Sequence, residues 1–202
     1  MISEADKACI SQEIIEKLTH NLNHPPQERP LLILLGGFQG SGKSTVAQAL
    51  EKAHQYTVIS TDAIRHELLQ KNITGDLFAK MVSSISKIIL MKVLDQRLNL
   101  IVDANAHEKR IREVTDLMQH YPSYRVVKIY LQTSEKVLFE RLASRPQVPG
   151  HYQGQPGDLQ GSLQSSKMNT ADYDLVLQTD NLTIEQELTS INSLLASYYT
   201  VS

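Results

Sequence analysis

Eight consecutive residues have the glycine, lysine and hydroxyl spacing of a loop that can hold a chain of phosphates. Residues 37–44 read Gly-Phe-Gln-Gly-Ser-Gly-Lys-Ser and match GxxxxGK[ST]. Glycines let successive amide N–H groups turn inward, and the positive end of a following helix adds to their attraction for nucleotide phosphates. The predicted nucleotide-binding residues are Gly37, Gln39, Gly40, Ser41, Gly42, Lys43, Ser44 and Thr45.

Two side chains of this loop, and one acidic residue further along the chain, have more specific expected roles. Lys43 is expected to reach the β- and γ-phosphate oxygens of ATP, and the Ser44 hydroxyl is expected to ligate Mg²⁺. Asp103 ends the apolar run at 99–103, where a carboxylate can hold a water of the metal shell. The alternative for Asp103 is a simple cap of the next helix.

A second acidic residue follows the predicted strand at 56–60. Asp62 and Arg65 lie one turn apart at the start of a predicted helix, so their side chains share a face. A carboxylate there can accept the proton of an acceptor hydroxyl, and a guanidinium can clamp an anionic group. The alternative is that Asp62 interacts with the helix dipole and Arg65 is its solvated partner.

Two arginines lie at the end of a predicted helix over 134–144. Arg141 and Arg145 are four residues apart and precede a segment rich in Gly, Pro and Gln that extends to about 169. This placement would let two cations swing over a nucleotide, one to stack on adenine and one to neutralise developing charge. The alternative is ordinary charge at a helix C-terminus.

Apolar runs alternate with amphipathic segments and predict the elements that position these residues. Strands are expected at 31–35, 56–60, 99–103, 125–131 and 173–177. The alternation predicts an α/β fold, a parallel sheet covered by helices on both faces, with ligands at the carboxyl ends of the strands. An amphipathic helix before His24 and a final helix over about 183–198 complete the pattern.

The chain has 202 residues, which suits one α/β domain. We expect an N-terminal helix and linker over 1–30 and the main domain over 31–202. A lid is expected at about 145–170, because that segment is too long for a simple connection.

Composition narrows the classes of partner. The formal net charge is −2, so no global positive field would attract nucleic acid or an anionic membrane. Cys9 is the single cysteine, which fits a reducing compartment. Glu4 and Asp6 stand where a signal peptide would be basic, and no apolar run approaches the roughly 18 residues of a membrane span. We expect a cytoplasmic protein without a membrane segment.

Over about residues 31–190 the chain resembles the small P-loop kinases. The motifs that carry this resemblance are the loop at 37–44, Thr61-Asp62-x-x-Arg65, Val102-Asp103-Ala104-Asn105 and Arg141-x-x-x-Arg145. It is most similar to the group that includes polynucleotide 5′-hydroxyl kinases, zeta-toxin-like and chloramphenicol kinases, gluconate kinases and adenylylsulfate kinases. The resemblance implies a P-loop NTPase fold with a five-stranded sheet of order 2-3-1-4-5. It also implies ATP as donor, an acceptor hydroxyl near Asp62 and a mobile lid bearing both arginines.

The expected function is therefore ATP-dependent phosphoryl transfer to a hydroxyl of a small molecule, with Lys43, Asp62, Arg65, Arg141 and Arg145 as catalytic residues. One alternative is a kinase of nucleic-acid 5′-hydroxyl ends, although the near-neutral charge argues mildly against it. Another is a nucleotide-binding switch without transfer. GTPases of that kind normally carry Asn-Lys-x-Asp and Asp-x-x-Gly, whereas Asp103 is followed by Ala-Asn-Ala.

Overall fold

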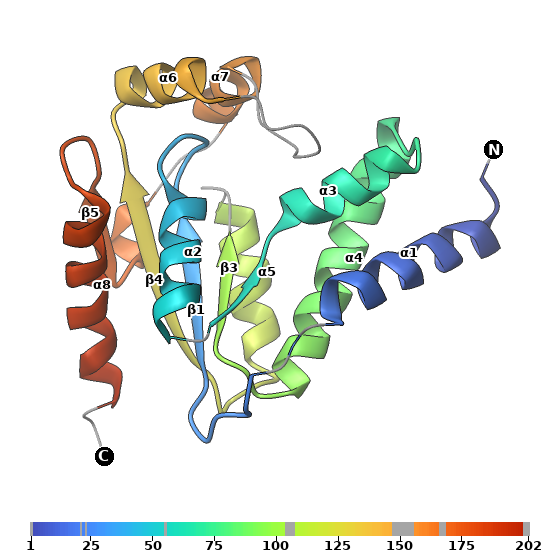
Figure 1. The fold of residues 1–202 in the computed structure, drawn as a ribbon, viewed down its shortest axis with the longest axis horizontal. Coiled ribbons are helices and arrows are strands. Elements are labelled where there is room, and N and C mark those ends of the chain that lie inside the picture. Colours follow the sequence, from blue (N-terminus) through green and yellow to red (C-terminus); the bar gives the residue numbers. More distant parts are fainter. Residues whose placement is uncertain are drawn as a thin grey trace.

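A five-stranded parallel sheet forms the centre of the molecule (Figure 1). The computed structural model describes residues 2–20, 22, 24–54, 56–103, 108–146, 156–165 and 169–199. The strands are β1 (Leu31–Gly36), β2 (Thr57–Ile59), β3 (Leu100–Asp103), β4 (Arg125–Gln132) and β5 (Leu175–Gln178). Their spatial order is β2-β3-β1-β4-β5 and every neighbouring pair is parallel, so the expected fold class and strand order are confirmed.

The strand order places the loop after β1 at the topological switch point of the sheet. On one side of β1 lie β3 and β2, and on the other lie β4 and β5. β1 pairs with β3 on one side and with β4 on the other. In open parallel sheets a ligand crevice forms outside the carboxyl ends of the strands at such a point. The glycine-rich loop therefore leaves β1 directly into the position that the topology favours for a ligand.

Helices cover both faces of the sheet because alternate residues of the central strand point to opposite sides. Leu31, Ile33 and Leu35 pack in a cluster with side chains of α2 (Lys43–His54) and α8 (Ile184–Tyr199). Leu32 and Leu34 pack in a second cluster on the opposite face. That cluster includes side chains of α3 (Thr61–Gln70), α4 (Gly75–Asp95) and α5 (Glu108–Met118).

The segment expected to be a lid contains a helix that the sequence did not predict. After α6 (Glu135–Ser144), residues 156–165 form α7 (Pro156–Ser165), and both lie above the carboxyl end of the sheet (Figure 1). Gly157 and Gly161 disfavour a helix by propensity, but Leu159 is fully buried with Leu138 and Leu142 of α6. Tertiary packing therefore stabilises α7 where local preference does not.

The last strand begins later than expected. The prediction started it at Tyr173, whereas β5 begins at Leu175. Residues 170–172 form a short 3₁₀ helix, and the Asp174 carboxylate accepts a hydrogen bond from the Lys128 backbone amide at 2.7 Å. These local contacts take the place of the backbone hydrogen bonds with β4 that an earlier start of β5 would require.

The N-terminal helix α1 (Glu4–Thr19) packs on the face formed by α3 and α4. Ser3 caps it through a reciprocal pair of hydrogen bonds with Asp6, a capping box. Ile14 and Ile15 enter the core cluster, and the Lys17 ammonium donates to both carboxylate oxygens of Glu67 on α3 at 2.8 Å. α1 is thus tied to the helix that begins with Asp62.

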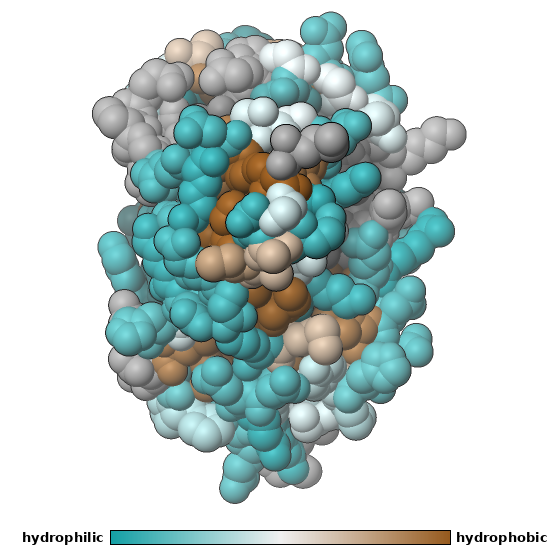
Figure 2. All heavy atoms as spheres, turned by 90° about the vertical axis from the view of Figure 1, so that its right-hand side faces the viewer, coloured by the Kyte–Doolittle hydropathy of each residue, from teal (hydrophilic) through white to brown (hydrophobic). Residues whose placement is uncertain are grey.

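The side of the molecule that bears α1, α3 and α4 is shown in Figure 2. Apolar side chains appear there in patches separated by hydrophilic ones. Leu69 of α3 and Ile88 and Met91 of α4 are among the large apolar residues that remain exposed. Within the described ranges, no helix combines the length and apolarity needed to cross a membrane.

The docking of α1 can be tested by stability. Ile14 is 1% exposed, so Ile14→Ala should lower the free energy of unfolding by about 2–5 kcal/mol. The matched control is Ile2→Ala, because Ile2 is exposed and its change should stay within about 0.5 kcal/mol. Urea unfolding measures both, and equal values for the two variants would contradict the docking of α1.

Candidate active site

A cavity of about 410 Å³ lies at the carboxyl end of the sheet. Its lining comes from the loop after β1 and from the starts of α2 and α3, the end of β3, the end of α6 and the start of α8. The described residues that line it are Gln39, Gly40, Gly42, Lys43, Ser44, Thr45, Asp62, Arg65, Asp103, Arg141, Leu142, Arg145, Ile184 and Glu187. The structure therefore brings together residues predicted from four separate segments.

Gly40 and Gly42 are two of the three loop glycines whose positive φ is a backbone conformation that other residues rarely adopt. Gly40 has a φ of +86° and Gly42 a φ of +100°, in the left-handed region where a Cβ atom is strained. A Cβ at Gly40 would also lie 3.1 Å from the carbonyl oxygen of Leu138 on α6. Gly40 thus permits both the turn of the loop and the close approach of α6.

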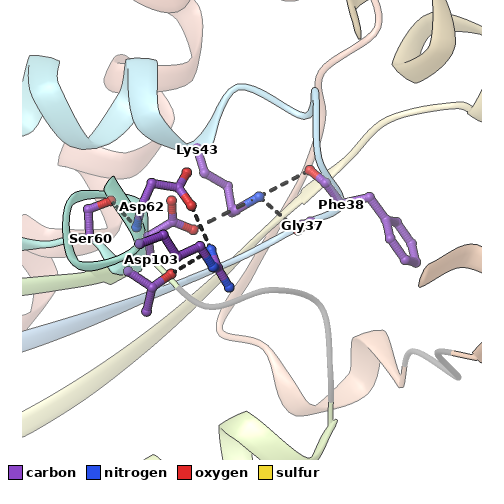
Figure 3. Close-up of polar contacts among 8 residues, drawn as sticks. Gly37, Phe38, Lys43, Ser60, Asp62 and Asp103 are labelled. Carbon is purple, nitrogen blue, oxygen red and sulfur yellow. Dashed lines mark hydrogen bonds and ion pairs between the residues drawn. The ribbon is translucent and has the colours of Figure 1, made fainter. Parts of the chain in front are cut away.

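Lys43 is the first residue of α2 and its side chain points back along the loop (Figure 3). Its ammonium donates hydrogen bonds to the carbonyl oxygens of Gly37 at 2.9 Å and Phe38 at 3.1 Å. It also lies 3.9 Å from a carboxylate oxygen of Asp103. The side chain is only 8% exposed, so these three oxygens balance a nearly buried positive charge.

Asp103 occupies the end of β3, beside this ammonium. Burial raises the pKa of its carboxyl from the ordinary 3.8, because desolvation disfavours the charged form. Lys43 and Arg65 lower this pKa, while Asp62 raises it, and burial is the largest of these influences. The Asp103 carboxylate would therefore be stabilised by additional positive charge.

Asp62, in the first turn of α3 (Figure 3), forms an ion pair with Arg65 of the same helix. The Arg65 guanidinium donates to the Asp62 carboxylate at 2.6 Å and to the Thr61 hydroxyl at 3.1 Å. Ser60 caps the helix by accepting the Asp62 backbone amide at 3.2 Å. Because Asp62 is 46% exposed, its carboxylate is held in direction but stays accessible from the cavity.

Arg141 connects α6 to the body of the protein. Its guanidinium donates to the Thr179 carbonyl at 2.7 Å, just beyond β5, and to the Gly40 carbonyl at 3.4 Å. These bonds place it against the phosphate loop rather than out on the segment expected to be a lid. Arg145, the residue that ends α6, lines the same cavity.

The start of α8 contributes two residues that the sequence did not suggest. Ile184 and Glu187 line the cavity one turn apart. Their sequence signal is weak, because acidic residues in the first turn of a helix are ordinarily explained by the helix dipole. The packing of α8 beside α2 and β5 brings them to the site.

Two predicted loop residues do not line the cavity. Gly37 contributes its carbonyl to Lys43, and Ser41 is buried beneath the loop with no hydrogen-bond partner for its hydroxyl among the described residues. The resemblance also involved Asn105 and a lid over 145–170. Asn105 and residues 147–155 and 166–168 lie outside the described residues.

The lining suits a phosphate chain with a divalent cation by its chemistry. Ser44 and Asp103 present a hydroxyl and a carboxylate to one cavity, and oxygen ligands of this kind are those that Mg²⁺ prefers. Lys43, Arg141 and Arg145 line it as well and offer the positive charge that phosphate oxygens require. The donor set therefore fits the group that the loop motif implies.

Known structures with the same architecture include several kinases. A candidate kinase from Chloroflexus aurantiacus j-10-fl aligns with a TM-score of 0.63 and 19% identity, over 82% of this chain and 98% of that one. A gluconokinase from Sinorhizobium meliloti 1021 gives 0.56 and 20%, over 87% and 100%. The APS kinase of Mycobacterium tuberculosis, in complex with AMPPNP and APS, gives 0.58 and 18%, over 85% and 99%. No curated protein sequence matches this chain significantly.

The fold and the glycine-rich loop are those of a P-loop protein, and the structures with the same fold include small kinases. A family model described as AAA domain matches residues 32–156, more than half of the chain. The chain belongs to this AAA domain family. The match begins in β1 and includes the phosphate loop, Asp62, Asp103, Arg141 of α6 and Arg145 directly after that helix.

The buried charge of Asp103 predicts a pH dependence of stability. Because its pKa is raised in the folded state, the stabilisation from this group is lost as the pH rises through the folded pKa. Relative to wild type, Asp103→Asn should therefore gain stability as the pH rises above about 4, measured by urea unfolding of the ligand-free protein. Asp116→Asn, at an exposed position of α5, is the control, and the same trend in both variants would argue against burial as the cause.

Proposed function

We propose that this protein is an ATP-dependent kinase that transfers the γ-phosphoryl group to a hydroxyl of a small-molecule acceptor. The observation that carries the proposal is the single cavity shared by Lys43 and Ser44 of the phosphate loop, Asp62 of α3 and Asp103 of β3. Phosphoryl transfer needs positioning and charge stabilisation of both reactants more than covalent chemistry. A site for the phosphates and a carboxylate for the acceptor within one cavity meet that need.

The phosphate loop would hold the donor. Backbone amides of the loop and the start of α2 would receive the phosphates, and Lys43 would exchange its bonds to the Gly37 and Phe38 carbonyls for phosphate oxygens. Ser44 and Asp103 would hold Mg²⁺, which supplies charge neutralisation across the phosphates when bound. The AMPPNP in the similar APS kinase structure supports an adenine nucleotide as the donor.

Asp62 would act on the acceptor. Its carboxylate accepts the proton of the acceptor hydroxyl as the new bond from that oxygen to the γ-phosphorus forms, and the bond from the γ-phosphorus to the β–γ bridging oxygen breaks. ADP leaves with the bridging oxygen. Arg65 holds the Asp62 carboxylate through their 2.6 Å bond, so the base is oriented before the acceptor arrives.

Arg141 and Arg145 would stabilise the charge that develops during transfer. Arg141 is anchored to the Gly40 and Thr179 carbonyls, which would keep its positive charge beside the phosphates without a large motion. Arg145, at the end of α6, lines the same cavity and would add a second positive charge beside the donor. Small acceptors are favoured because the gluconokinase and the APS kinase share this fold.

Release of ADP in the presence of candidate acceptors tests the proposal. The panel consists of sugars, hydroxy acids, nucleosides and oligonucleotides with 5′-hydroxyl ends, with ATP and Mg²⁺ present throughout. ADP release should rise with one class of small molecule. Labelled phosphate found on oligonucleotide ends alone would contradict a small-molecule acceptor, and release that no acceptor stimulates would contradict transfer.

Asp62→Asn examines the role of the base once an acceptor is known. The amide cannot accept the hydroxyl proton, so the acceptor-dependent rate should fall by about 10²-fold or more. Asp76→Asn, near the start of α4 and at an exposed position, should retain the wild-type rate. A loss of less than about threefold for Asp62→Asn would remove Asp62 from its role as general base.

A further inference from the structure

Glu187 has a buried side chain whose position beside the cavity suggests that its carboxylate binds part of a ligand. It lies in α8 and is 6% exposed, yet it lines the cavity. Its carboxylate has no hydrogen bond or ion pair with another residue of the described ranges. Burial of the rest of the residue leaves this partly desolvated carboxylate better stabilised with a donor than without one, and the cavity that it lines is where a donor can reach it.

The helix dipole does not explain this residue. Glu185 also lies in the first turn of α8 and is exposed, where a carboxylate interacts with the helix N-terminus without losing its hydration. Glu187 is buried by comparison, and burial raises the pKa of its carboxyl while the charge of Arg141 lowers it. The helix dipole therefore does not account for the buried position of Glu187.

Arg141 does not act as a hydrogen-bond donor to Glu187. The guanidinium is directed to the carbonyl oxygens of Thr179 and Gly40. Its positive charge stabilises the Glu187 carboxylate at longer range and leaves the carboxylate oxygens to accept from another group. A phosphate cannot be that group, because two anions repel each other.

The surroundings of Glu187 match a nucleobase. Ile184 lies one turn earlier on the same side of α8, and Leu142 of α6 also lines the cavity, so apolar walls accompany the carboxylate. The phosphate-binding side chains are on another element, at the start of α2. A base edge that offers an N–H donor between apolar walls suits this combination.

We infer that Glu187 recognises the exocyclic amine of adenine and so selects the base of the donor nucleotide. The inference rests on the proposed function, because it assigns the base of the same nucleotide whose phosphates the loop would hold. Adenine presents an amino group at the position where guanine and hypoxanthine present a carbonyl oxygen. The carboxylate would accept from the amine and repel the carbonyl.

Equilibrium binding without an acceptor tests this assignment. ATP, ITP and 2′-deoxyATP are titrated with Mg²⁺ into wild type, Glu187→Gln and Glu185→Gln, by calorimetry. Wild type should prefer ATP over ITP by about 10- to 100-fold, since a hydrogen bond to a charged group is lost. Glu187→Gln should reduce the preference to within about threefold, because an amide can also donate to the carbonyl of ITP. Glu185→Gln should keep the wild-type preference.

Each other outcome overturns the assignment. An unchanged ATP preference in Glu187→Gln would exclude contact with the amine. Equal weakening of all three nucleotides would identify Glu187 as a counter-charge for Arg141 only, and loss of an ATP preference over 2′-deoxyATP alone would move the contact to the ribose. Failure of wild type to bind any of the nucleotides would also overturn the proposed function, whereas binding with an unchanged preference would leave that function intact.

Discussion

The Lys43 ammonium is the charge on which the arrangement of the site depends. It connects the loop after β1 to the end of β3 through two carbonyl oxygens and the Asp103 carboxylate. An ion this deeply buried is tolerated only with close partners, so the loop must fold around it. The same requirement keeps the ammonium directed into the loop, where phosphate oxygens could replace the carbonyls with little motion.

The helices around the cavity differ in how they are held. α6 approaches the loop closely because Gly40 has no Cβ, and Arg141 fixes it to the backbone beyond β5. α7 is attached to α6 by the apolar cluster around Leu159. On the opposite side of the cavity, α1 stabilises α3 through buried isoleucines and the pair of Lys17 with Glu67. The family match begins at residue 32, so α1 precedes the matched region and adds support to the helix that carries Asp62.

Most of the fold could be predicted from the sequence because its signals are local. The apolar run at 31–35 and the glycines after it have few alternatives to a buried strand and a phosphate loop. The other strand positions followed from the same kind of run, with errors of a few residues where local contacts such as that of Asp174 compete with the ladder. α7 was missed because its glycines disfavour a helix and its stability comes from α6.

The sequence alone predicted which residues would bind phosphates, since a loop of this spacing acts through its own backbone and two adjacent side chains. It also indicated Asp62, Arg65 and Asp103, because each stands at the end of a strand or the start of a helix. Only the tertiary structure decided that Arg141 is anchored to the loop and that Ile184 and Glu187 complete the cavity. Those contacts join segments far apart in the chain or depend on side-chain direction, and packing of the helices on the sheet selects them rather than any local preference.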